Sequence, residues 1–158
     1  MASQSRLTSE LAQEAHETML IAVQPLQREY EMHVTESESG GCLAGVRLQN
    51  QDTFISLTWS PKEGLEYSIG PLVDGLVPPA DIFYRPGQSP HAYEIAWFAK
   101  LAGVQRNADI RGKIDGFAES LRTGVELVMK IAGAFLAGDW SRREKLDELI
   151  EQNYRDRT

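Results

Sequence analysis

The stretch that decides the fold spans residues 30–70 and reads YEMHVTESESGGCLAGVRLQNQDTFISLTWSPKEGLEYSIG. Apolar and polar residues alternate along it in four runs, and a period of two is typical of strands with one buried face. The apolar rows are Tyr30, Met32 and Val34; Cys42, Ala44, Val46 and Leu48; Ile55, Leu57 and Trp59; and Leu65, Tyr67 and Ile69. Short connections join these runs, so the pattern predicts an antiparallel meander whose apolar face must be covered.

A helix is expected before the meander, from about Thr8 to the region of Pro25. Its apolar residues recur at steps of three and four and form a single stripe. Pro25 cannot donate a backbone hydrogen bond to the preceding turn, so we expect the helix to kink or end there.

Three helices are expected after the meander. Ser89 and Pro90 read as the start of the first, which Gly103 would stop. The second and longest should span about residues 114–137, and its glycines, Gly124 and Gly133, suggest the close approach of a neighbouring backbone. Residues 141–144, with the sequence SRRE, read as a capping box for the last helix.

These elements define the predicted fold class, which is α+β. We expect a single domain in which one N-terminal helix and three C-terminal helices pack on an antiparallel meander of four to five strands. Its parts would be the N-terminal helix (1–29), the meander (30–70), a proline-rich connection (71–90) and a helical part (91–158).

The proline-rich connection is the least regular part of the chain. Residues 70–90 hold five of the seven prolines, together with Phe83, Tyr84 and Arg85, which could form an isolated edge strand. A connection of this length within a compact domain is more often functional than not. The alternative interpretation is a rigid crossover between the sheet and the helices, and the sequence leaves both open.

Length and charge bound the class of protein. The chain has 158 residues and a formal net charge of −7. We therefore expect no binding to nucleic acid or to an anionic membrane surface, because both need a positive patch. Cys42 is the only cysteine, which excludes an internal disulfide. No apolar run is long enough to cross a bilayer and none reads as a signal peptide, so we expect a cytoplasmic protein.

No pattern of reactive residues predicts catalysis. The histidines, His16, His33 and His91, lack the spacing of a helical metal pair, and no serine lies in a nucleophile elbow. Arg142 and Arg143 are expected to be solvated or paired with acids of the last helix. The sequence therefore predicts no catalytic residue, no metal and no cofactor.

Interaction with another protein is the remaining class. Aromatic residues and arginine are common anchors of interfaces, although most aromatics of a small domain belong to its core. The candidate binding residues are Phe83, Tyr84, Arg85 and His91, in or beside the proline-rich connection. A protein partner is expected, and a homodimer is possible if an apolar helix stripe is exposed.

Residues 136–141, with the sequence LAGDWS, close the long helix before a final one, and residues 70–73 (GPLV) lead to Pro78 and Pro79. In this order of elements the chain resembles small bacterial immunity-type and uncharacterised single-domain proteins. The resemblance implies a cytoplasmic binding protein whose partner is a toxin or effector, as for an antitoxin. It transfers no functional residue, because its motifs are structural turns.

Two alternatives stay open. An acidic secretion-type chaperone is similar in composition and in the strands after Gly41. A small-ligand-binding protein or enzyme would use a pocket between the sheet and the helices, drawing on Tyr67, His91 and Trp97.

Overall fold

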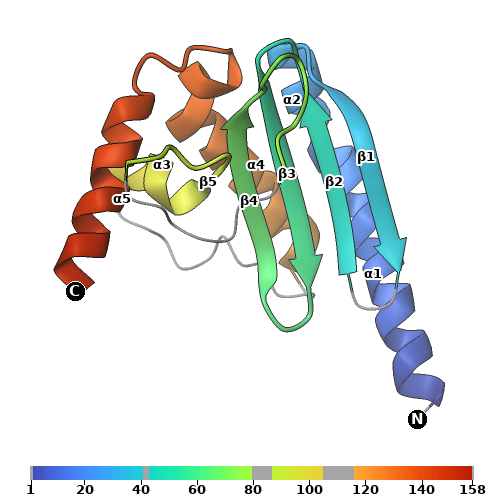
Figure 1. The fold of residues 1–158 in the computed structure, drawn as a ribbon. Helices are drawn as coiled ribbons and strands as arrows, with labels where there is room; N and C mark the ends of the chain where they lie inside the picture. The colour runs from blue at the N-terminus through green and yellow to red at the C-terminus, as the bar shows by residue number, and fades with distance from the viewer. Residues whose placement is uncertain (1, 41–42, 80–86, 105–115, 158) are drawn as a thin grey trace.

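The structure of the chain is a computed structural model that describes residues 2–40, 43–79, 87–104 and 116–157. One antiparallel sheet forms one layer, and helices lie behind it and beside it (Figure 1). The elements are α1 (Ala2–Ala22), α2 (Gln24–Tyr30), β1 (His33–Gly40), β2 (Leu43–Gln49), β3 (Thr53–Ser60), β4 (Gly64–Pro71), β5 (Tyr93–Glu94), α3 (Ile95–Leu101), α4 (Phe117–Leu136) and α5 (Arg143–Arg157). The predicted α+β class with an antiparallel meander is confirmed.

The sheet has the order β1-β2-β3-β4-β5, so every strand pairs with its neighbours along the chain. Two short turns join β2 to β3 and β3 to β4. The side-chain oxygen of Asn50 accepts hydrogen bonds from the backbone nitrogens of Asp52 and Thr53 at 3.0 Å each. Gly64, with a φ of 74°, closes the turn between β3 and β4, where a residue with a Cβ would be strained.

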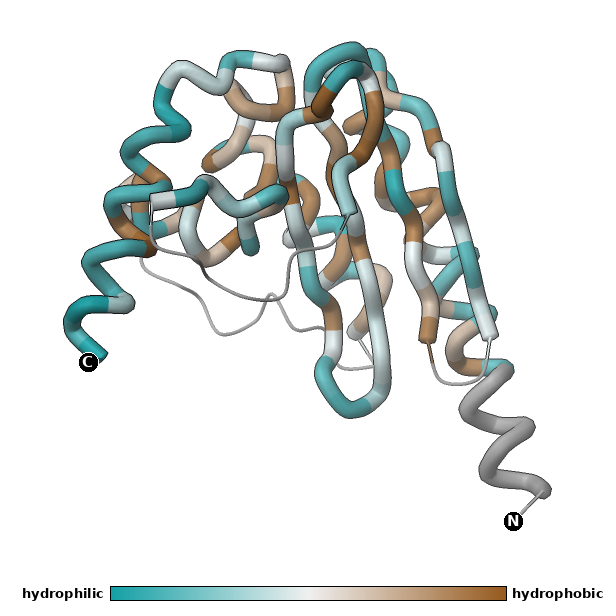
Figure 2. Tube along the Cα trace, in the orientation of Figure 1, coloured by the Kyte–Doolittle hydropathy of each residue, from teal (hydrophilic) through white to brown (hydrophobic). Residues whose placement is uncertain are grey.

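The predicted apolar rows form the core. All residues of these rows from Ala44 to Ile69 are buried, namely Ala44, Val46, Leu48, Ile55, Leu57, Trp59, Leu65, Tyr67 and Ile69. Helix α1 packs behind β1 and β2, and α4 packs behind β3 (Figure 1). Figure 2 shows hydrophobic stretches in the strands and in the helices behind them, whereas α5 is mostly hydrophilic. Cys42 lies outside the described residues.

The first strand begins later than the sequence predicts. Tyr30 is the last residue of α2, and β1 starts at His33. Pro25 ends α1, as expected, but it also lies in the first turn of α2, where a missing N–H costs nothing and the fixed φ favours a new helix. Glu31 follows α2 in the left-handed conformation, with a φ of 54°, and the helix ends there. The start predicted for the first helix is also wrong, because α1 already begins at Ala2.

The predicted helix at Ser89 and Pro90 is wrong as well. Tyr93 and Glu94 pair with Ile69 and Ser68 of β4, so they form a fifth strand and the helix begins only at Ile95. The backbone groups of this segment bond to the open edge of β4, which outweighs the local helix-start signal. Helix α3 ends at Leu101, and Gly103 follows with a φ of 70°, as expected of a helix stop.

The glycines of α4 are needed for tyrosine side chains and not for a neighbouring backbone. A Cβ at Gly124 would lie 2.3 Å from the Tyr67 hydroxyl, and a Cβ at Gly133 would lie 3.1 Å from that of Tyr30. Tyr67 therefore extends from β4 until its hydroxyl meets the surface of α4. Close packing here depends on a missing methyl group.

Two polar side chains tie the β2–β3 turn to the end of α4. The Asn50 amide donates to the carbonyls of Tyr30 at 3.0 Å and Leu136 at 2.8 Å. Thr53, which is fully buried, donates to the carbonyl of Phe135 at 2.7 Å and accepts from the indole N–H of Trp140 at 2.8 Å. The bonds from Asn50 satisfy carbonyls at the ends of two helices, and the bond from Thr53 adds to the one that the Phe135 carbonyl accepts from the backbone N–H of Gly138.

The capping box predicted at Ser141 does not form in that way. The Ser141 hydroxyl and backbone N–H both bond to Asp139, and these hydrogen bonds hold the pKa of the Asp139 carboxyl below its usual value. The serine is thereby used in the turn before the helix, and α5 begins at Arg143.

Candidate binding surface

The chain makes a tight turn directly after β4. Val73 and Leu76 exchange two backbone hydrogen bonds of 2.9 and 3.0 Å. Asp74 and Gly75 between them have φ values of 54° and 76°, the left-handed pair that a two-residue hairpin turn requires. We call this unit the Val73–Leu76 turn. Its two aliphatic side chains are 55% and 70% exposed.

The Val73–Leu76 turn is attached to the sheet on both sides. The backbone N–H of Leu72 donates to the carbonyl of Asp52 at 2.8 Å. Further along, the Nδ1 of His91 bonds to the carbonyl of Pro79 at 2.7 Å, so this ring nitrogen is the donor. The turn thus presents apolar surface from a fixed backbone.

His91 is the one predicted binding residue that the structure describes. Its side chain is half-buried and directed at the proline-rich connection, and its own carbonyl lies against Gly70, where a Cβ would approach it to 2.3 Å. His91 therefore positions the connection. Phe83, Tyr84 and Arg85 lie outside the described residues, and so does the edge strand expected there.

The sheet surface that faces away from α1 and α4 is polar, and we call it the outer face. Strand register places its residues in two rows across the strands, with glutamates at both ends of each row: Glu38, Gly45, Thr58 and Glu66; and Glu36, Arg47, Ser56, Ser68 and Glu94. Arg47 bonds to the Glu36 carboxylate at 3.0 Å and donates to the Ser56 hydroxyl at 3.4 Å. The four glutamates are exposed, so this face is acidic.

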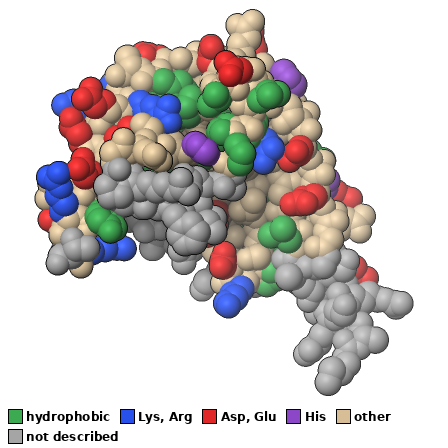
Figure 3. Space-filling model, viewed as in Figure 1, with side chains coloured by type: hydrophobic (Ala, Val, Ile, Leu, Met, Phe, Trp, Pro, Cys, Tyr) green, Lys and Arg blue, Asp and Glu red, His purple; other side chains and the backbone are tan. Residues whose placement is uncertain are grey.

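Hydrophobic side chains lie on the same side of the molecule. In Figure 1 the connection after β4 crosses in front of the upper ends of β3 and β4, and Figure 3 shows hydrophobic side chains gathered there beside a histidine. Phe54, although buried, does not belong to the main core cluster and meets Gly70 instead. The connection after β4 and the acidic rows therefore share one side of the molecule.

A second polar network joins α5 to the segment before β5. Asp147 accepts hydrogen bonds from the hydroxyls of Tyr93 and Ser89, the latter at 2.6 Å. Arg143 donates to the Tyr93 hydroxyl at 3.0 Å and to the Pro90 carbonyl at 2.8 Å. The sequence predicts that Arg143 is solvated or paired with acids of its own helix. Its hydrogen bonds reach Tyr93 and Pro90 instead.

The chemistry of this network is that of a structural clamp. Burial, supported by the hydrogen bond to Asp147, raises the pKa of Tyr93 from 10.0 to about 12, and Arg143 opposes this shift. A phenol with this pKa stays neutral near pH 7 and acts as a hydrogen-bond donor. The arrangement holds α5 against β5.

The residues proposed for a pocket between the sheet and the helices have other partners in the structure. Tyr67 is 1% exposed and meets α4, His91 points to Pro79, and Trp97 lies under the ammonium group of Lys100 at 5.7 Å. Hollows of about 550, 740 and 70 Å³ that the described residues line lie on the outer face, between α1, α2 and α4, and between α3 and α4. None of these three is lined by Tyr67, Trp97 or His91.

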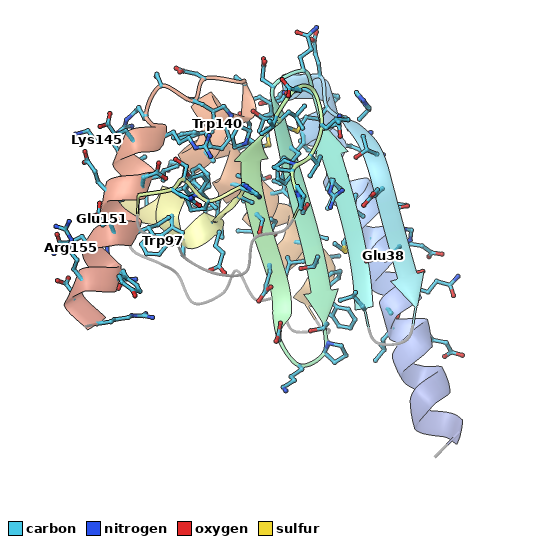
Figure 4. The ribbon with its side chains drawn as sticks, in the orientation of Figure 1. Glu38, Trp97, Trp140, Lys145, Glu151 and Arg155 are labelled. Carbon is cyan, nitrogen blue, oxygen red and sulfur yellow. The ribbon has the colours of Figure 1, made fainter. Side chains whose placement is uncertain are left out.

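The aromatic residues that the structure describes belong mainly to the interior. Trp59, Tyr67 and Tyr93 are buried, and Trp140 packs edge-on against Phe135 and Phe98 at ring distances of 5.0 and 6.4 Å. Figure 4 shows Trp140 near the end of α4 and Trp97 on α3. The exposed side chains of the Val73–Leu76 turn are aliphatic instead, and sequence reasoning missed them. The dipeptide Asp74–Gly75 between two aliphatic residues is a hairpin signal that could have revealed them.

Fold and surface together define an α+β meander domain with an apolar turn beside an acidic sheet face. Comparisons with protein-family models, curated proteins and solved structures found no match. The resemblance to immunity-type proteins therefore stays a prediction. Within the described ranges, no helix is long and apolar enough to span a membrane. Among the same residues, no three His, Cys, Asp or Glu side chains are grouped so that they could hold a metal ion.

Proposed function

We propose that this chain is a non-catalytic protein-binding domain of the immunity or antitoxin kind. The observation that carries the proposal is the Val73–Leu76 turn, which exposes two aliphatic side chains from a hydrogen-bonded backbone. The turn is ordered by its own hydrogen bonds, so little conformational entropy is lost when a partner covers it.

Burying these two side chains would contribute substantially to the free energy of binding. Covering an exposed valine or leucine contributes about 1.5–3 kcal/mol each when burial is complete. Two such residues at the centre of an interface would act as its anchors, with the polar outer face as part of its rim. The glutamates of that face favour a partner with a basic contact surface, because complementary charge speeds association and selects partners.

The experiment compares the wild type with the double variant Val73→Ser/Leu76→Ser. Tagged proteins are used to capture partners from a lysate of the source cells, and the affinity for each captured protein is then measured with purified components. We expect the double variant to fold normally and to lose at least about tenfold in affinity, since about 1.4 kcal/mol corresponds to a factor of ten.

Ile21→Ser is the matched control. Ile21 is 67% exposed on α1, behind the sheet, so this change removes a similar exposed aliphatic group without touching the turn. Full affinity of the double variant, or loss only in Ile21→Ser, would contradict the proposal. The earlier candidates Tyr84 and Arg85 are tested in the same assay by their joint replacement with alanine.

A further inference from the structure

The free edge of the sheet is a second surface, separate from the Val73–Leu76 turn. β1 is an edge strand of eight residues, and among the described residues nothing pairs with its outer side. Every second residue of such a strand directs its backbone N–H and C=O away from the sheet, where they can pair with another extended chain. From Glu36 to Gly40 the register with β2 is regular, because the irregularity lies between Val34 and Glu36.

The charges on this edge decide what can pair with it. Glu36 and Glu38 both lie on the outer face and are exposed (Figure 4 labels Glu38 on β1). A symmetric antiparallel pair keeps the outer faces of both copies on the same side, and its registers of longest overlap place Glu36 opposite Glu36 or opposite Glu38. Like charges directly opposite each other destabilise a strand pair. A second copy of this chain is therefore a poor occupant, and a strand with Lys or Arg at alternate positions is a good one.

A hollow next to the edge provides space for such a side chain. The hollow has a volume of about 550 Å³ and is lined by Glu36, Glu38, Gly45, Arg47 and Thr58 among others. Gly45 places no side chain in this hollow, and a Cβ there would be in ordinary contact with Glu38, 3.6 Å from its Oε1. Neighbouring strands are about 4.8 Å apart, so a lysine or arginine on an added strand can lean across Glu38 to the space above Gly45.

We infer that the β1 edge binds an extended basic segment of another protein by strand addition, with one Lys or Arg side chain in the hollow above Gly45. This inference rests on the proposed function in that the ligand is a protein, but it uses a different surface from the Val73–Leu76 turn. Glu36 already bonds to Arg47 at 3.0 Å, so Glu38 is the acid that the added cation would contact.

The test uses the full chain and two blocked peptides of about eight residues, one of alternating lysine and valine and one of alternating glutamate and valine. At an ionic strength of about 0.01 M the Debye length is about 30 Å, so the charge contribution is fully expressed. We expect the lysine peptide to bind with a Kd below about 1 mM and to slow amide hydrogen exchange in residues 36–40. The glutamate peptide should not bind.

Three variants separate this site from a general charge effect. Gly45→Val should weaken the lysine peptide about tenfold by filling the hollow, while the melting temperature stays equal or rises, because valine favours strands. Glu38→Lys should weaken it about fivefold. Glu63→Lys carries the same change of net charge in the exposed β3–β4 turn and should stay within about twofold.

Several outcomes would overturn the inference: no binding of the lysine peptide, equal binding of both peptides, protection outside β1, or unchanged affinity in Gly45→Val. A dimer of the chain with protected β1 amides would assign the edge to a second copy and overturn it too. Val73→Ser/Leu76→Ser should leave peptide binding intact, so failure of the turn as a partner site and failure of the edge site are distinguishable.

Discussion

Replacing Gly124 by alanine tests the packing of the sheet on α4 most directly. An alanine in the middle of a helix is normally favourable by about 1 kcal/mol relative to glycine. At this position the new methyl group would lie 2.3 Å from the Tyr67 hydroxyl and 3.2 Å from the ring carbon that carries it. The first distance is far below van der Waals contact, so the ring or the helix must move.

The size of the penalty follows from how little the ring can move. Tyr67 is 1% exposed, and its hydroxyl already lies against Gly124 of α4. Overpacking of this kind costs about 1–3 kcal/mol, and a rigid aromatic neighbour places the cost at the upper end. After the gain in helix propensity, we expect a net loss of about 2 kcal/mol in the free energy of unfolding. For a domain of this length that corresponds to a decrease of about 4–8 °C in melting temperature.

Tyr67→Phe supplies the matching half of a double-mutant cycle. The Tyr67 hydroxyl is buried and no described group forms a hydrogen bond with it. Removing a buried polar group of this kind is nearly neutral or stabilising. In the Tyr67→Phe background, Gly124→Ala should therefore lose most of its penalty, with a coupling energy of about 2 kcal/mol between the two sites.

The assay is urea unfolding followed by circular dichroism for the four members of the cycle. Gly133→Ala is the control, since its Cβ would lie 3.1 Å from the hydroxyl of half-buried Tyr30, a mild crowding that offsets part of the gain in helix propensity, and we expect a change between zero and a gain of about 1 kcal/mol. An unchanged stability of Gly124→Ala, or an equal loss in both backgrounds, would refute the steric argument.

Further predictions concern the polar contacts between distant elements. Asn50→Ala removes four hydrogen bonds and should lower the free energy of unfolding, measured in urea, by about 2–4 kcal/mol. The exposed control Gln51→Ala should lower it by less than about 0.5 kcal/mol, and similar losses in both variants would contradict the role of Asn50. Asp147→Ala should cost about 1–3 kcal/mol because two hydroxyls lose their acceptor, and exposed Glu148→Ala is the control in the same thermal melt. Folding raises the pKa of Tyr93 from 10.0 to about 12, so the unfolded chain releases this proton first, and stability should fall as pH rises from about 10 to 12. The fall should be smaller in Tyr93→Phe, and an identical pH profile would exclude this contribution.

Much of the fold was predictable because its signals are local. Alternation within each run identifies the buried rows of β2, β3 and β4, and the stripe of α4 identifies its buried side. The predictions failed where a local signal competes with a distant partner. Pro90 marks a helix start within its own segment, yet Tyr93 pairs with Ile69 on a strand more than twenty residues earlier.

The candidate surface was predicted only in outline. The sequence singles out the proline-rich connection as unusual and favours Phe83, Tyr84 and Arg85 as its anchors, which lie outside the described residues, whereas the described part exposes Val73 and Leu76. Composition indicates which residue types tend to bind partners, but exposure depends on what covers each residue. Aromatic residues bury the largest areas, and here Tyr93, Phe98 and Trp140 join β5, α3 and the turn after α4.

The sequence by itself determined the class of this protein, an α+β meander covered by helices, because hydrophobic periodicity acts over a few residues and needs no knowledge of distant partners. Only the tertiary structure decided which residues meet across the core and which stay in solvent. Gly124 is required by a tyrosine from β4, Asn50 by the ends of two helices, and Gly45 leaves a hollow beside the free edge. The contacts of Gly124 and Asn50 join segments far apart in the chain, so no local pattern encodes them.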